Sequence, residues 1–321
     1  MGLWIEQRRG ELRETRHPVS ARVVEAGTVR WQVGEDVACF WRSGCKAFQL
    51  RTALAQLPSE SLEWLSDADL AIGAASHSGQ PEHLARVRRI LRHFSVHARL
   101  LRCGAHLPIH LPSAHKLLGR RQKPTALHNN CSGKHTFMLA ACRAQGWSTD
   151  YLPAAHPLQV LNLSTITELA GQSPGTAVDG CGVPTFHLPI SAMARAYATL
   201  AAAMAGDGDA LLGRIGRAMG AFPELTSGTG RLDLAVVRAA TEPISVKIGA
   251  EGLFDIALPA RRLGVVIKVH SGNSEALAVA VAAVMAEVAP GALGDWTPAE
   301  AVVLNVAGRE VGERRAVWAA D

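Results

Sequence analysis

The sequence contains few aromatic residues and no long apolar run. Phe, Trp and Tyr make up 5% of its 321 residues, and the best candidate for a membrane span, residues 276–288, is too short to cross a bilayer. Residues 1–16 alternate Glu and Arg without an apolar core, so we expect no signal peptide and a cytoplasmic protein. Six cysteines in a chain of this length do not predict a disulfide framework.

The charge balance is mildly basic, with 33 Lys and Arg residues against 28 Asp and Glu and a formal net charge of +5. Basic residues cluster at 86–89 and 120–123, but no aromatic residues alternate with them. We therefore expect no nucleic-acid partner and no membrane partner, but an electropositive rim suited to small anionic substrates. A hydrophobic content of 48% predicts a globular protein with a large core.

Hydrophobic patterns divide the chain into β-rich ends and a helical middle. Residues 21–25 and 29–33 flank Ala26-Gly27-Thr28, which predicts a hairpin, and residues 37–41 form a third short run that leads into Arg42-Ser43. Helical spacing marks residues 43–57, 82–97, 132–144, 158–169, 191–205, 209–221 and 273–288, whereas residues 244–248, 254–258 and 265–269 have β character.

These patterns predict an α+β fold, with an antiparallel sheet built from both chain ends and an inserted helical region. The β-type runs are joined by short turns, which favours hairpins over parallel βαβ units. We expect residues 1–321 to form a single globular unit. Its sheet part would comprise about 17–80 and 226–321, and its helical insert about 81–225.

The Ser43-Gly44-Cys45-Lys46 segment places a hydroxyl and an amine about one helical turn apart. Ser76-His77-Ser78 and Lys247-Ile248-Gly249 follow in the order found in serine β-lactamases and penicillin-binding proteins. This order predicts acyl-transfer chemistry with Ser43 as nucleophile, Lys46 as its base, Ser76 as a proton relay and Lys247 as a supporting cation. The alternative is that Ser43 caps a helix and Lys46 is a solvated residue of its first turn.

A lysine can act as a base near neutral pH only when its environment disfavours the ammonium form. Lowering a lysine pKa from about 10.4 to about 7–8 requires about 4 kcal/mol of differential stabilisation. Burial and a neighbouring cation both act in that direction. The prediction therefore needs Lys46 and Lys247 to lie close together and away from water.

Two cysteines lie in segments rich in polar and turn-forming residues. Cys131 falls within residues 128–135, which open the helix expected at 132–144, and Cys181 lies in a loop braced by glycine and proline at 178–184. Two thiolates with His and Asp nearby suit Zn²⁺. The residues alone leave two alternatives open, a reactive nucleophilic Cys131 or ordinary buried thiols.

Taken together, these segments resemble the rhizobial-type, or class 3, L-asparaginases from about residue 23 to residue 312. The resemblance is carried by residues 42–49, 75–79, 128–135, 179–184 and 247–252, with further matching blocks at 103–106 and 228–231. It implies a fold like the serine β-lactamases and glutaminases, hydrolysis of L-asparagine to L-aspartate and ammonia, and a homodimer.

The resemblance also implies roles for particular residues. The family's two Ser–Lys pairs fall on Ser43–Lys46 and Ser76–Lys247, and its zinc ligands fall on Cys131, Lys134 and Cys181. A lysine ligand must be deprotonated, so zinc affinity should fall as the pH is lowered. The residues expected to contact substrate or to orient the site are Arg42, which would bind the substrate carboxylate, Asn130, His135 and Asp179.

The chain departs from the family pattern at three places, which bear on substrate affinity and on the choice between asparagine and glutamine. Gly79-Gln80 replaces an expected Gly-Glu, His270-Ser271-Gly272 lacks an expected Asp, and Cys45 stands where an aliphatic residue is more usual. Alternative functions are a glutaminase, a hydrolase of β-lactams or D-amino-acid peptides, and a non-catalytic sensor of amino acids or metals.

Overall fold

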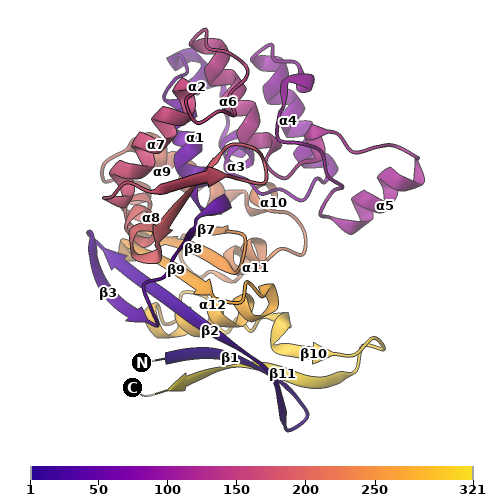
Figure 1. Ribbon diagram of the computed structural model, residues 1–321, viewed down its shortest axis with the longest axis vertical. Coiled ribbons are helices and arrows are strands. Elements are labelled where there is room, and N and C mark those ends of the chain that lie inside the picture. The colour runs from indigo at the N-terminus through magenta and orange to yellow at the C-terminus, as the bar shows by residue number, and fades with distance from the viewer. Residues whose placement is uncertain (1, 320–321) are drawn as a thin grey trace.

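Both ends of the chain contribute strands to one antiparallel sheet (Figure 1). The structure is a computed structural model that describes residues 2–319, so the two ends of the predicted unit, residue 1 and residues 320–321, lie outside it. The strand order is β10-β11-β1-β2-β9-β8-β7, and β3 pairs with β2. The strands are β1 (Gly2–Arg9), β2 (Leu12–Glu25), β3 (Thr28–Val33), β7 (Ser245–Ile248), β8 (Leu253–Leu258), β9 (Leu263–Val269), β10 (Val302–Leu304) and β11 (Glu310–Ala319).

The sheet begins earlier in the chain than the sequence patterns predict. Strand β1 and the first part of β2 fall within residues 1–16, ahead of the expected start at about 17. Most of the Glu and Arg residues of this hairpin are exposed and pair with one another, as Arg9 does with Glu14, while Leu3 and Ile5 are buried. A period of two with one apolar face is therefore present, but the charged face conceals it.

The helical layer occupies the middle of the chain and begins at residue 46, ahead of the expected start at about 81 (Figure 1). Its α-helices are α1 (Lys46–Leu54), α2 (Ser59–Trp64), α3 (Asp67–Gly73), α4 (Pro81–His93), α5 (Leu111–Gly119), α6 (Ser132–Ala144), α7 (Pro157–Ala170), α8 (Ile190–Met204), α9 (Ala210–Ala221) and α10 (Pro223–Thr226). Helices α11 (Leu232–Ala239) and α12 (Ser274–Val288) follow. Short 3-10 helices span Arg42–Cys45, Ala98–Leu100, Ala126–His128, Pro259–Arg261 and Ala299–Ala301. The α+β prediction is confirmed.

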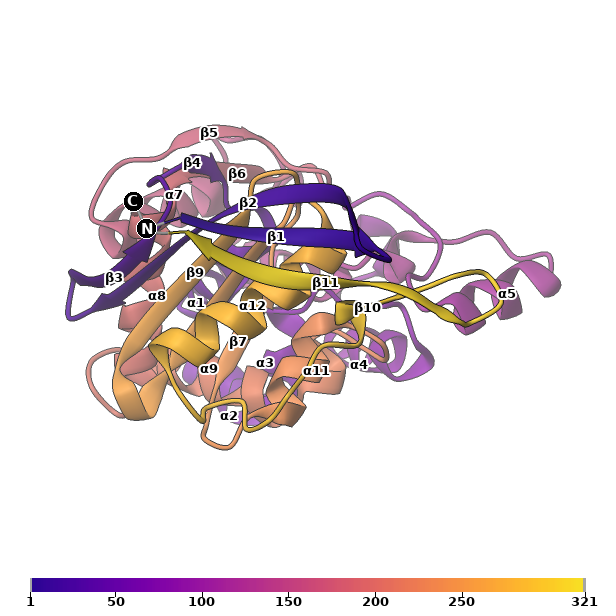
Figure 2. The ribbon, with the colours of Figure 1, turned by 90° about the horizontal axis from the view of Figure 1, so that it is seen from below.

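The central strands are buried on both faces, and consecutive residues point into different cores. On β8, Leu253 and Ala257 pack into the core shared with the helical layer, whereas Phe254 and Ile256 pack into the core that contains α12. Figure 2 shows α12 on the side of the sheet away from most of the helices. This alternation decides which side chains of β7 and β8 face the candidate site.

A second, three-stranded sheet connects the start of the helical layer with a distant loop. Its order is β4-β6-β5, with β4 (Ala38–Phe40), β5 (Gly175–Val178) and β6 (Pro184–Pro189). The run at 37–41 was expected to be a strand, but β5 and β6 were not recognised because the sequence there is short and rich in turn formers. Through this sheet the loop 179–183 reaches the turn at residues 42–45.

Within residues 2–319, no helix combines the length and apolarity needed to cross a membrane.

Replacing Gly264 with Ala should destabilise the fold by about 1–3 kcal/mol, because it overpacks the contact between β9 and α8. A Cβ at this position would lie 2.2 Å from the backbone O of Ala194 and 2.2 Å from the backbone N of Ala198. Gly119→Ala, at a helical position with open space around it, is the matched control and should not destabilise. Chemical denaturation of both variants measures the difference, and equal stability would contradict this packing constraint.

Candidate active site

Two hydrogen bonds from buried groups hold the turn that carries Ser43. Strand β4 leads into the 3-10 helix Arg42–Cys45 and then into α1, so Ser43 lies where a strand passes into a helix, as predicted. Trp41 donates its indole N–H to Asp255 Oδ1 at 2.9 Å, and the hydroxyl of Tyr197 donates to the backbone O of Gly44 at 2.8 Å. Ser43 itself is only half-buried, so it is the accessible hydroxyl of the site.

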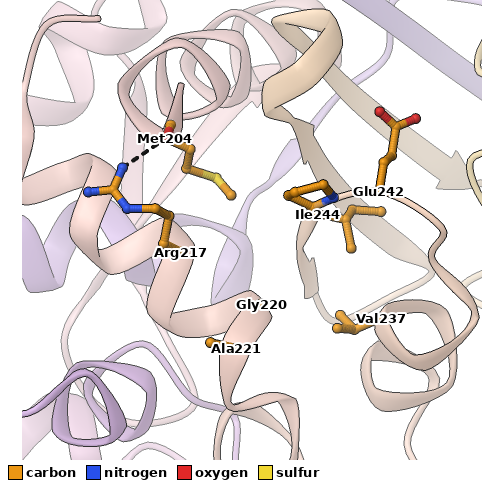
Figure 3. Close-up of a pocket in the computed structure, with 8 residues that line it drawn as sticks. Met204, Arg217, Gly220, Ala221, Val237, Glu242 and Ile244 are labelled. Carbon is orange, nitrogen blue, oxygen red and sulfur yellow. Dashed lines mark hydrogen bonds between the residues drawn. The ribbon is translucent and has the colours of Figure 1, made fainter. Parts of the chain in front are cut away.

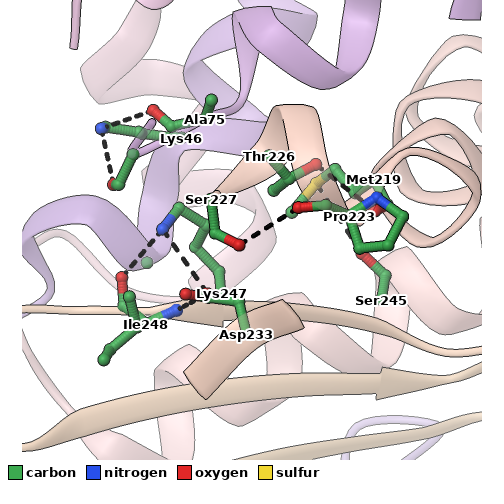
Figure 4. Close-up of polar contacts among 12 residues, drawn as sticks. Lys46, Ala75, Met219, Pro223, Thr226, Ser227, Asp233, Ser245, Lys247 and Ile248 are labelled. Atoms are coloured by element: carbon green, nitrogen blue, oxygen red, sulfur yellow. Dashed lines mark hydrogen bonds and ion pairs between the residues drawn. The ribbon is translucent and has the colours of Figure 1, made fainter. Parts of the chain in front are cut away.

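Lys46 contacts Ser76 and not Ser43. Its Nζ donates to Ser76 Oγ at 2.8 Å and to the backbone O of Ala75 at 2.7 Å (Figure 4). Both Lys46 and Ser76 are buried, and Ser76 is fixed by its backbone N–H, which donates to the O of Thr226. Among the hydrogen bonds of residues 2–319 there is none between the side chains of Ser43 and Lys46, the pair expected from their spacing.

Lys247 reaches the same region from the sheet. Its side chain on β7 is fully buried, and its Nζ donates to the backbone O of Ile248 at 3.0 Å and lies 3.9 Å from Asp233 Oδ1 (Figure 4). Burial lowers the pKa of Lys247 to about 8, against the opposing effect of Asp233 and with help from Lys46. The expected pair with Ser76 is not a hydrogen bond within the part of the chain that the structure describes.

Two buried carboxyl groups lie near Lys247, and the sequence patterns identified neither of them. Asp255 lies directly opposite Lys247 in the β7–β8 register, and burial raises its pKa to about 8. Asp233, on α11, accepts the backbone N–H of Ile248 at 2.6 Å. An Asp in the middle of Leu253–Leu258, an otherwise apolar strand, is the one sequence signal that could have pointed to this group.

The two candidate cysteines converge on one lysine. Cys131 is the residue before α6, and Lys134 Nζ, one turn into that helix, donates to Cys181 Sγ at 3.4 Å. Cys131 Sγ lies 3.2 Å from Asn130 Oδ1, and Cys181 Sγ lies 3.4 Å from Asp179 Oδ2. The structure thus brings all three residues of the predicted zinc set into one buried cluster.

The cluster shares a single stabilised negative charge between its thiols. A hydrogen bond from Cys181 holds the pKa of Cys131 well below the usual value for a thiol, against the effect of burial, and the same contact raises the pKa of Cys181. Burial would lower the pKa of Lys134, but the neighbouring Cys181 and Cys131 outweigh it and raise that pKa. In this arrangement the Lys134 ammonium neutralises the thiolate.

The donor set of this cluster fits zinc. Within residues 2–319, no three His, Cys, Asp or Glu side chains are arranged to hold a metal ion. The predicted set instead contains two sulfur donors and the amine of Lys134, which lies 3.4 Å from Cys181 Sγ. Two thiolates and one nitrogen supply three positions of a tetrahedral site and leave a fourth for another ligand.

The residues expected to contact substrate surround this cluster. Arg42 forms an ion pair with Asp179, and Lys134 and this guanidinium hold the pKa of Asp179 below its usual range despite burial. His135 is fully buried with Nδ1 2.8 Å from the hydroxyl of Tyr151, while its Nε2 has no partner among the described residues. Burial keeps the pKa of His135 well below the usual value, so its ring is neutral.

A cleft of about 310 Å³ lies beside the segment that carries Ser76. Arg88, Lys116 and Arg120 contribute basic side chains to its lining, together with Gly79 and His128. Another cavity, of about 350 Å³, lies between α8 and α9 on one side and the segment from α11 to β7 on the other (Figure 3). None of the candidate site residues lines this second cavity.

The departure at Gln80 has a structural explanation. Its side-chain Nε2 donates to Thr229 Oγ1 at 3.2 Å, and its Oε1 accepts the backbone N–H of Thr229 at 2.9 Å. Gln80 Nε2 also donates to Glu82 Oε1 at 3.0 Å. A Glu at position 80 could still accept from the backbone and from the hydroxyl of Thr229, but it could not donate to Glu82. Gln80 therefore joins the segment after Ser76 to the loop that precedes α11.

Tyr197→Phe should lower the free energy of unfolding by about 1–2 kcal/mol, because it leaves the buried backbone O of Gly44 without its hydroxyl donor. The ring itself is retained, so its packing against Trp41 and Phe48 is preserved. Denaturation monitored by circular dichroism measures the loss. Wild-type stability in this variant would show that the Tyr197 hydroxyl does not support the Ser43 turn.

Comparison with known proteins identifies a family for this chain. The family model for L-asparaginase II matches residues 5–316. Among solved structures, a β-lactamase from Mycobacterium bovis is 15% identical, with a TM-score of 0.43, and the match covers 84% of this chain and 94% of that one. No curated protein matches the sequence significantly. The family match spans nearly the whole chain, and the protein therefore belongs to the L-asparaginase II family of amidohydrolases.

Proposed function

We propose that this protein hydrolyses L-asparagine to L-aspartate and ammonia by a Ser–Lys mechanism, with a zinc site next to the bound substrate. Membership of the L-asparaginase II family supports the substrate. The observation that carries the mechanism is the 2.8 Å hydrogen bond to Ser76 Oγ from Lys46 Nζ, the amine three residues after the accessible Ser43.

Ser43 is the nucleophile in this proposal, because it is the more exposed of the two serines. Its Oγ attacks the carbon of the side-chain amide and forms a C–O bond, and the backbone N–H of Ser43 stabilises the oxygen that becomes negative. The C–N bond then breaks and ammonia leaves with the transferred proton. Water hydrolyses the resulting β-aspartyl ester, which releases L-aspartate and restores the Ser43 hydroxyl.

The buried groups behind Ser43 move the proton. Lys46 is one helical turn from Ser43 and contacts Ser76, so Lys46 and Ser76 together form a route from the nucleophile to the leaving nitrogen. Burial lowers the pKa of Lys247 to about 8, so this side chain is still largely an ammonium at about pH 7. In this proposal its positive charge supports the route electrostatically.

The ends of the amino-acid substrate meet complementary charges. Arg42 presents a guanidinium for the α-carboxylate, and Asp179 presents a carboxylate for the α-ammonium group. The partnerless Nε2 of His135 and the amide of Asn130 are further hydrogen-bonding groups beside the cluster. This arrangement selects a small zwitterion over a neutral amide.

The zinc ligands in this proposal are Cys131, Lys134 and Cys181. A bound zinc ion would supply positive charge and orient the loops and the substrate. Cys131 precedes α6 and Cys181 lies between β5 and β6, so the metal would join the helical layer to the small sheet. The homodimer, which comes from the family resemblance, and the cytoplasmic location belong to the same proposal.

Ser43→Ala should reduce ammonia release from L-asparagine by about 10³-fold or more, because no other accessible hydroxyl replaces the nucleophile. Ser61→Ala, a partly buried serine on α2, is the matched control and should leave the rate unchanged. Parallel assays with L-glutamine and a chromogenic cephalosporin test the alternative substrates. Substantial turnover by Ser43→Ala would exclude Ser43 as nucleophile.

Cys131→Ser and Cys181→Ser should each lower the bound zinc from about one ion per chain to a small fraction, as measured by mass spectrometry of the metal after dialysis. Cys39→Ser, outside the cluster, should retain the zinc. If zinc orients the substrate, the metal-free protein should show a raised KM with a smaller change in kcat. Equal zinc content in all three variants would contradict this ligand set.

A further inference from the structure

Asp255 is a fully buried carboxyl group within the large sheet. It sits in the middle of β8, where every residue is buried, and its carboxyl group has no contact with solvent. Its Oδ1 accepts the indole N–H of Trp41, but its Oδ2 has no hydrogen-bond partner among residues 2–319. A buried carboxylate with an unsatisfied oxygen is strongly disfavoured, so an apolar strand that retains one needs an explanation.

The strand register places Asp255 on the face of the sheet that carries the catalytic lysine. Its neighbours Leu253 and Ala257 pack into the core of the helical layer, and Lys247 lies directly opposite it on β7. A shift of one residue would turn the carboxyl group toward α12. The Asp and the Lys are therefore paired across the strands on the side of the candidate active site.

The same carboxyl group lies against the turn that carries the nucleophile. A Cβ at Gly44 would come within 2.3 Å of Asp255 Oδ2 and within 2.4 Å of Trp41 Cδ1. Trp41 and Gly44 flank Arg42 and Ser43 in the sequence, so Asp255 contacts the turn on both sides of the nucleophile. Only a glycine at position 44 allows this approach.

We propose that Asp255 is a positioning residue of the active site, which holds the Ser43 turn through Trp41 and Gly44 and, in its carboxylate form, favours the ammonium form of Lys247. The catalytic part of this inference rests on the proposed asparaginase mechanism. Asp255 does not touch the substrate, and its effect on the reaction passes through Ser43 and Lys247.

The charged surroundings of the pair support an electrostatic link. Burial raises the pKa of Asp255 to about 8 and lowers that of Lys247 to about 8, so the two groups titrate over the same pH range. Asp233, Cys45, Cys39 and Tyr197 are the other titratable groups whose charges interact with Asp255, while Asp233, Lys46, Arg231 and Cys131 act on Lys247.

The first test is the pH profile of Asp255→Asn, which keeps the shape of the side chain and an acceptor for Trp41. Removal of the negative charge removes an attraction for the Lys247 ammonium, so Lys247 loses its proton at a lower pH. The limb of the kcat profile set by this group should move by about one pH unit toward lower pH. KM should change little, because Asp255 makes no contact with substrate.

Ser245→Ala is the matched control, since Ser245 lies on the same face of β7 and its hydroxyl donates to the sulfur of Met219, away from Asp255 and Lys247. Its pH profile should coincide with that of the wild type. A loss of rate in Asp255→Asn without any shift of the profile would mean a purely structural role and would overturn the electrostatic part. An unshifted profile with normal kcat would overturn the whole inference.

The second test does not need activity. In wild-type protein labelled with fluorotryptophan, the ¹⁹F resonance of Trp41, assigned by its loss in Trp41→Phe, should shift with a midpoint near pH 8 as Asp255 ionises. A resonance that stays constant from pH 6 to pH 10 (about two units either side of that midpoint) would overturn the inference. Absence of ammonia release from asparagine by the wild type would instead reject the proposed function and leave this titration intact.

Discussion

Removal of three lysine amines from water is the constraint on which the rest of the site depends. Lys46, Lys134 and Lys247 are almost fully buried, and each has a different set of partners. Lys46 donates to a hydroxyl and a carbonyl, Lys134 faces thiols, and Lys247 lies between two carboxyl groups. An unpaired buried ammonium is costly, so each lysine needs acceptors nearby. The chain supplies these acceptors from segments far apart in the sequence. These contacts join the helical layer to the sheet.

Much of the fold follows from local patterns. The bounds of α6 coincide with the predicted 132–144, and β7, β8 and β9 lie within two residues of the predicted runs, because buried elements appear in the sequence as apolar runs bounded by turn residues. The strands that escaped prediction are β1, β5, β6, β10 and β11. Among them, β1 carries charged residues and β5 is exposed over its whole length. Pairing with β11 or β6 creates these strands, and that pairing depends on segments far away in the sequence.

The candidate site was predictable in its residues but not in its contacts. Spacing identified Ser43, Lys46, Ser76 and Lys247, yet it suggested that Lys46 would bond to its near neighbour Ser43. The fold instead turns Lys46 toward Ser76, thirty residues further along the chain. Asp255 was missed for a related reason. The role of a single Asp in a strand can be recognised only from the strand register, which places Lys247 opposite it, and from its hydrogen bond to Trp41.

The pairing of β1 with β11 has a consequence for how the protein is made. Gly2 lies opposite Ala319, so β1 is synthesised long before its partner β11. Until β11 is present, the sheet remains open along β1, with one row of backbone N–H and C=O groups unpaired. Pairing over such a sequence separation raises the contact order, so closure of this edge is a slow step that local helix formation cannot replace.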